Sequence, residues 1–195
     1  MTDVNRAQFL TRGAAGGLAL VAGGSVLGLA AGQATAATAA GDVAIAKLAA
    51  TAELLAVDFY SRAIASRKFV GDERDYLIDA RRNERDHYRA LAKVLGSGAP
   101  KGVRFQYPDG AFASRKSIAK LGVALETAFV GAYLGAVTAL KSNDLKGVAA
   151  QIGASEAQHL SVFSDIALDD PVGISFPKAL TAAQATKAVT PFLAA

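Results

Sequence analysis

Both histidines of the chain lie in Glu-x-x-His motifs, and each motif sits within a long stretch of helical pattern. Residues three apart on a helix share one face, so each motif presents a carboxylate and an imidazole in the same direction. Two other glutamates stand alone on the apolar stripes of two further helical stretches. One such glutamate from each of two helices, with a Glu-x-x-His pair from each of two others, is the ligand set of a dinuclear metal site in a helical bundle. The candidate ligands are Glu53, Glu84, His87, Glu126, Glu156 and His159.

The number of carboxylates in this set argues for two divalent metal ions. Four glutamates in an apolar core are costly to bury as charges, and without cations they would tend to stay protonated. Two divalent ions balance the four negative charges; two glutamates can then bridge the ions, which leaves one glutamate and one histidine for each. Oxygen-rich ligation with one imidazole per ion suits iron first and manganese second, although zinc would also bind. The alternative is a metal-free polar core in which every group is hydrogen-bonded.

The spacing of the candidate ligands favours the metal site over this alternative. Four of the five glutamates in the chain occupy helical stripe positions. Glu53 and Glu126 are 73 residues apart and the two Glu-x-x-His motifs are 72 residues apart, so the chain repeats in outline. Tyr60 and Tyr133 each follow their lone glutamate by seven residues. Both are candidates for a hydrogen bond to a metal ligand or for a redox role, with core packing the favoured interpretation.

The sequence around these motifs predicts an all-α chain with four long helices. The first spans Asp42–Ser66, has Asp42 as its N-cap and contains neither glycine nor proline. The others are expected over about 72–95, over 114–141, and from the Ser142–Asp144 cap to Leu168. Apolar residues recur at spacings of three and four in each of them. The predicted bundle therefore occupies residues 42–169.

A long segment without helical periodicity, Gly96–Ala113, separates the second and third helices. Eighteen extended residues reach about 60 Å, whereas a helix of about 24 residues is roughly 36 Å long. The segment can therefore run the length of the bundle, which predicts an antiparallel four-helix bundle with one long crossover. Residues 170–195 follow as a proline-punctuated tail, in which Thr181 and Gln184 predict the capping box of a short final helix.

The first 36 residues resemble an export signal. An arginine-containing start precedes an uncharged Gly/Ala/Leu-rich stretch, and Ala36 and Ala39 each end an A-x-A cleavage pattern. The segment around Arg6 is twin-arginine-like, with Ala7 in place of the second arginine, so the twin-arginine and general export routes both stay open. We therefore expect the export machinery as a partner and a periplasmic or extracellular location. Removal of residues 1–36 takes away two arginines and one aspartate and changes the net charge from +4 to +3.

The composition excludes several other kinds of chemistry. The chain has no cysteine, which excludes disulfides, thiolate zinc sites and iron–sulfur clusters. Its 21 lysines and arginines form no stripe interleaved with aromatic residues, so we expect no nucleic-acid partner. Whether the chain forms a homo-oligomer stays open at this point.

On its ligand pattern the sequence resembles the ferritin-like superfamily, and more specifically the exported ferritin-like proteins related to desiccation-related proteins. The resemblance covers about residues 42–169 and implies that the six candidate residues are metal ligands. The second Glu-x-x-His motif is closer to bacterioferritin and rubrerythrin than to storage ferritins. Met1 is the only methionine, so haem bound through methionine is not expected, and the cysteine-based domain of rubrerythrin is missing.

Two functions follow from the resemblance as expectations. The first is an exported protein with a dinuclear iron or manganese centre that reacts with dioxygen or peroxide, as an oxidase, peroxidase or ferroxidase protecting against stress. Dioxygen, peroxide or ferrous iron would then be its small-molecule partner. The second is a non-enzymatic metal-binding or desiccation-protective bundle. Leu91, one turn beyond His87, argues against room for a large organic substrate beside the ligands.

Overall fold

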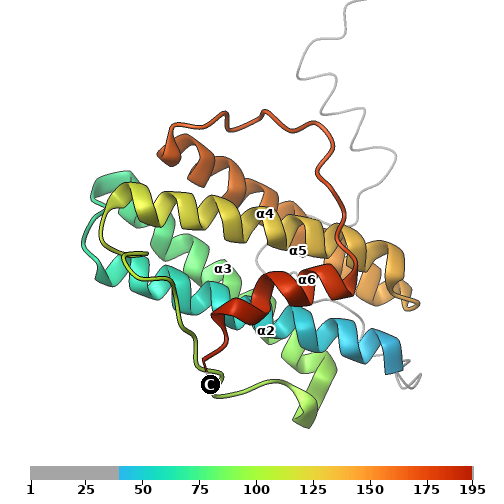
Figure 1. Ribbon diagram of the computed structural model, residues 1–195. Coiled ribbons are helices and arrows are strands. Elements are labelled where there is room, and N and C mark those ends of the chain that lie inside the picture. Colours follow the sequence, from blue (N-terminus) through green and yellow to red (C-terminus); the bar gives the residue numbers. More distant parts are fainter. Residues whose placement is uncertain (1–39, 195) are drawn as a thin grey trace, which may run out of the picture. The chain divides into compact units, whose positions relative to one another are not determined.

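The computed structural model describes residues 40–194, so the predicted export signal over 1–36, with its cleavage positions at Ala36 and Ala39, lies outside the described residues. The helices are α2 (Ala40–Ala65), α3 (Gly71–Leu95), α4 (Arg115–Ala139), α5 (Asn143–Ala167) and the short α6 (Ala182–Val189). The long helices pair as two hairpins, α2 with α3 and α4 with α5, and α6 packs on α2 and α4 (Figure 1). The predicted all-α class, with four long helices and a short C-terminal one, is confirmed.

Side-chain caps begin three of the helices at positions that the sequence marks. Ser142 caps α5, because its side chain accepts a hydrogen bond from the backbone N–H three residues on. Thr181 and Gln184 form the predicted capping box of α6. Ser114 opens α4 in a second capping box with Ser117. Such caps satisfy N–H groups that have no partner inside the helix, which fixes where each helix starts.

Asp42 has a different role from the predicted one. It was expected to be the N-cap of the first helix, but α2 begins before it and the side chain is buried. Its carboxylate accepts hydrogen bonds from the backbone N–H groups of Lys141 at 3.0 Å and Ser142 at 2.9 Å, and these bonds lower the pKa of Asp42. The chain leaves α4 at Leu140, which has extended backbone, so α4 ends before the predicted Lys141. Asp42 therefore fixes the α4–α5 connection to the start of α2.

The long connection between α3 and α4 lies along the bundle as the crossover. Its start is held to α3, because the Tyr88 hydroxyl donates to the carbonyl of Pro100 at 2.7 Å. Its middle is held to α2, because the Tyr107 hydroxyl donates to the carbonyl of Leu55 at 3.4 Å. These contacts place the crossover across one side of the first hairpin (Figure 1).

The apolar core forms two layers with a polar zone between them. One layer includes Phe59, Leu77 and Phe163, and the other includes Leu91 and Ile152. On α3 the Glu-x-x-His motif lies between Leu77 and Leu91, and on α5 the second motif lies between Ile152 and Phe163. The fold therefore places both motifs at mid-height in the bundle, with apolar side chains above and below them.

Gly122 on α4 is expected to tolerate no side chain, because a Cβ there would lie 2.6 Å from the ring of the buried Phe163. Gly122→Ala should destabilise the fold by about 1–3 kcal/mol, the usual range for overpacking a core. Gly147 on α5 is the matched control, since nothing lies within 4 Å of a Cβ placed there. Gly147→Ala should be neutral or stabilise by up to about 1 kcal/mol. Urea unfolding checks both variants, and equal midpoints would contradict the tight packing at Gly122.

Candidate metal centre

The bundle brings all six predicted ligands together at its centre, one or two from each long helix. Glu53 comes from α2 and Glu126 from α4, while α3 and α5 each supply one Glu-x-x-His pair. The four glutamates are at most 2% exposed and His159 is 3% exposed, whereas the side chain of His87 keeps 14% of its surface accessible. The predicted convergence of these residues is therefore present in the structure.

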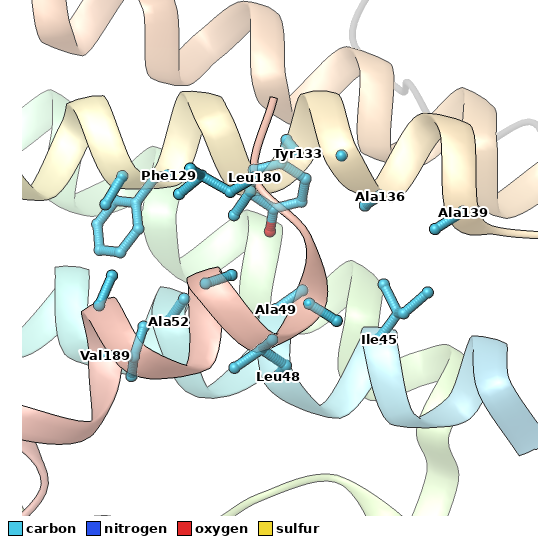
Figure 2. A pocket seen from close by; sticks show the side chains of 16 residues that line it. Ile45, Leu48, Ala49, Ala52, Phe129, Tyr133, Ala136, Ala139, Leu180 and Val189 are labelled. Carbon is cyan, nitrogen blue, oxygen red and sulfur yellow. The ribbon is translucent and has the colours of Figure 1, made fainter. Parts of the chain in front are cut away.

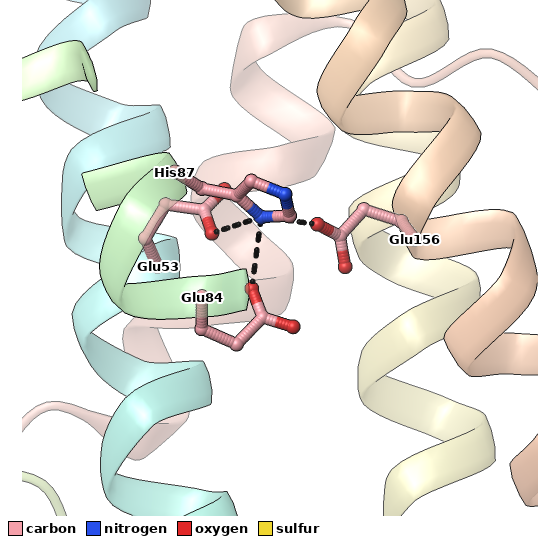
Figure 3. A group of neighbouring side chains, drawn as sticks. All are labelled: Glu53, Glu84, His87 and Glu156. Carbon is pink, nitrogen blue, oxygen red and sulfur yellow. Dashed lines mark hydrogen bonds and ion pairs between the residues drawn. The ribbon is translucent and has the colours of Figure 1, made fainter. Parts of the chain in front are cut away.

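One group of four ligands surrounds the imidazole of His87. Its Nδ1 atom lies 3.3 Å from Glu53 Oε2, 3.2 Å from Glu84 Oε2 and 3.1 Å from Glu156 Oε1 (Figure 3). Each of these four residues offers one ligand atom, and the atoms all lie within 4.8 Å of one another. A spacing of this order is what a single cation needs from a shared set of ligands.

A second group of four surrounds the imidazole of His159. Its Nδ1 atom lies 2.8 Å from Glu84 Oε1 and 3.5 Å from Glu156 Oε2. Glu126 completes the group, again with ligand atoms within 4.8 Å of one another. Glu84 and Glu156 belong to both groups, so they are the two glutamates placed to bridge a pair of ions. The structure therefore separates two glutamates shared by both groups from two that belong to one group only, a distinction that the sequence left open.

Several polar atoms of the cluster are buried and make no hydrogen bond of ordinary geometry, although ion-pair contacts join most of them to a neighbouring side chain of the cluster. They are Glu84 Oε1, Glu126 Oε2, both carboxylate oxygens of Glu156, and His159 Nδ1. A buried polar atom without a well-formed hydrogen bond is costly, more so when it is charged, so five of them in one place call for a common partner. All five are oxygen or imidazole nitrogen atoms that bind hard or borderline cations. The residues present therefore fit two divalent metal ions.

In the metal-free protein, burial and the neighbouring charges shift the pKa values of the cluster in opposite directions. Burial raises the pKa of Glu53 and of Glu126 well above the ordinary range of a carboxyl group. Burial also raises the pKa of Glu84, but the close contacts with His159 and His87 have the larger effect and lower it to about 2. Burial lowers the pKa of each histidine, yet the surrounding carboxylates raise it to about 12 for His87 and about 9 for His159. These shifts favour protonation of the histidines and of the two lone glutamates in the metal-free protein.

Each of the two predicted tyrosines is buried and hydrogen-bonded to a candidate ligand. The Tyr60 hydroxyl donates to Glu126 Oε1 at 2.5 Å, and the Tyr133 hydroxyl donates to Glu53 Oε1. Seven residues separate each tyrosine from the glutamate on its own helix by about 10 Å along the axis, so it meets the glutamate of the opposite hairpin instead. Packing, the favoured interpretation, is thus only part of their role, because each also holds the orientation of a carboxylate.

Two residues that the sequence analysis missed also contact the cluster. The side-chain amide of Asn83 lies 3.4 Å from Nε2 of His159, on the ring edge that faces away from the carboxylates. The Tyr76 hydroxyl lies 3.2 Å from that of Tyr60 and donates to the backbone carbonyl of His159 at 3.3 Å. Asn83 directly precedes the motif residue Glu84, so its position in the sequence indicates that it lies near the site. Tyr76 has no comparable spacing relation to the predicted ligands.

Comparison with known proteins agrees with this architecture. A family model described as a ferritin-like domain matches residues 41–168, which is more than half of the chain and contains all four long helices except the first residue of α2. A comparison with curated proteins gives no match. The matched range, the helical bundle and the Glu/His cluster at its centre lead to one assignment. The chain belongs to the ferritin-like domain family.

Proposed function

We propose that the protein binds two divalent metal ions, iron ahead of manganese, as a dinuclear centre bridged by Glu84 and Glu156. The observation that carries this proposal is the convergence of six buried or half-buried Glu and His side chains in two groups that share Glu84 and Glu156, with five buried polar atoms that make no well-formed hydrogen bond. His87 with Glu53 completes one position. His159 with Glu126 completes the other.

The proposed reaction is oxidation by dioxygen or peroxide, as in an oxidase, peroxidase or ferroxidase. Bound iron or manganese would supply the redox chemistry of such a reaction. The chain contributes the surroundings: apolar layers above and below the centre exclude water, and Tyr60 and Tyr133 hold the two terminal carboxylates. Because the side chain of His87 is the most exposed of the ligands, a small oxidant or an incoming ion would reach the centre on that side.

The proposal extends to where the protein works. We infer that it is exported to the periplasm or beyond and protects against oxidative or drying stress, on the strength of the signal-like first 36 residues. The same centre without turnover would make it a metal-sequestering protective bundle, and the experiment below separates these two activities.

Metal loading followed by exposure to peroxide tests the proposal. The full chain is loaded anaerobically with Fe(II) or Mn(II), desalted, and its metal content is measured by mass spectrometry. About two ions per chain are expected, followed by a change in the near-ultraviolet spectrum and consumption of peroxide or oxidation of added Fe(II). Fewer than about one ion per chain would overturn the metal centre. Two ions without any turnover would overturn the oxidase activity and leave sequestration.

A further inference from the structure

An apolar cavity lies outside the metal cluster, between α2, α4 and α6 (Figure 2). Sixteen residues line it, nine of them alanines, and Tyr133 is the one lining residue with a polar side-chain atom. Alanines from three helices line it, and their short side chains leave space between the helices. An apolar pocket favours apolar molecules, because their binding removes hydrocarbon surface from water.

The helix α6 forms the roof of the cavity, and the segments on both sides of it are hydrogen-bonded to the rest of the fold. The space therefore does not come from a loosely packed helix. Before α6, the backbone N–H of Leu180 donates to the carbonyl of Gly131 at 2.8 Å. A Cβ on Gly135 would lie 1.7 Å from the Leu180 carbonyl oxygen, so only glycine permits this approach. After α6, the N–H of Gln106 in the crossover donates to the carbonyl of Phe192 at 2.9 Å.

The cavity is elongated along α4. Its lining on α4 extends from Ala128 to Ala139, a distance of about 16 Å along the helix axis. A second, smaller cavity adjoins it and shares four lining residues, among them Tyr133, before reaching Leu91 and Ala149 inside the bundle. An apolar space of this length, with no charged residue in its lining, suits one extended hydrocarbon chain. We propose that this cavity binds a single unbranched hydrocarbon chain, such as that of a free fatty acid, with any polar head group left in solvent.

The cavity adjoins the metal centre through one residue. The ring of Tyr133 lines both cavities, and its hydroxyl donates to Glu53, a ligand of the first group. A chain in the cavity would therefore lie against the phenol that orients Glu53, separated from the ligands by that ring. Any reaction of the bound hydrocarbon at the metal centre rests on the proposed function, whereas binding of the hydrocarbon in the cavity does not.

Calorimetric titration of the metal-free full chain with dodecanoic acid tests the proposal. We expect saturable binding of about one molecule per chain, and similar binding of 1-dodecanol because the cavity recognises the hydrocarbon. Ala132→Leu places a larger side chain in the cavity and should weaken binding at least tenfold. Ala124→Leu is the matched control on the exposed side of the same helix and should leave binding unchanged.

Two outcomes would overturn the proposal: no saturable binding, or equal affinity in the two leucine variants. Circular dichroism verifies that both are folded, and Ala185→Leu on the roof replaces Ala132→Leu if that variant does not fold. Metal content is measured in the same proteins. Binding of dodecanoic acid by a protein that takes up no metal would overturn the proposed function and support this inference. Uptake of metal without binding of dodecanoic acid would support the proposed function and overturn this inference.

Discussion

Replacing Glu84 with glutamine is expected to empty both metal positions at once. Glu84 belongs to both ligand groups, with Oε2 3.2 Å from His87 Nδ1 and Oε1 2.8 Å from His159 Nδ1. Glutamine keeps the size of the side chain but removes the negative charge that two cations would share. Affinity should fall by more than about a hundredfold, the upper end of the loss seen when only outer partners of a metal site are disturbed. Metal content after loading and desalting measures the effect.

Two further variants give this result its meaning. Glu53→Gln removes a ligand that belongs to one group only, so about one ion per chain should remain. Asp86→Asn removes a charge from the exposed face of the same helix as Glu84, where Asp86 pairs with Arg89, and should leave about two ions. Loss of the same number of ions from Glu84→Gln and Glu53→Gln would show that Glu84 does not bridge.

The fold and the convergence of the six residues could be predicted because each depends on a pattern within one helix. Apolar stripes at spacings of three and four locate the helices, and a glutamate on such a stripe must face the core. The pairing of each tyrosine with a glutamate across the bundle depends instead on the axial offset between α4 and α2. That offset places Glu126 level with Tyr60 and Glu53 level with Tyr133, and it is set by packing between helices.

The parts that the sequence did not reveal involve contacts between distant segments. Asp42 has the residue type and the sequence position of an N-cap, yet its hydrogen-bond donors are backbone N–H groups about a hundred residues away. The cavity beside Tyr133 likewise requires the tail to return over α4, which Gly131 and Gly135 permit. Leu91 suggested little room near the ligands, but the larger cavity lies on the other side of Tyr133. The periodicity of residues within one helix carries no information about such contacts between distant segments.

Metal loading is expected to raise the melting temperature by roughly 15–30 °C at about pH 8.5. A ligand present at a thousand times its dissociation constant stabilises the folded state by about 4.1 kcal/mol per site. Two sites then contribute about 8 kcal/mol, and a protein of this size shifts by roughly 2–4 °C per kcal/mol. Differential scanning calorimetry of loaded and chelator-treated protein measures the difference. Glu84→Gln treated in the same way should show almost none.

The same difference in melting temperature should widen as the pH rises. In the metal-free protein the pKa of His159 is raised to about 9 and that of His87 to about 12, above the ordinary value of 6.5. Their contribution to stability is therefore fully present below about pH 6.5 and is lost progressively as the pH rises through 9 towards 12. Metal must displace these protons, so its binding strengthens over the same range. A difference that narrows between about pH 6 and pH 8.5 would mean that the histidines are not ligands, because only ligand protons compete with the ions.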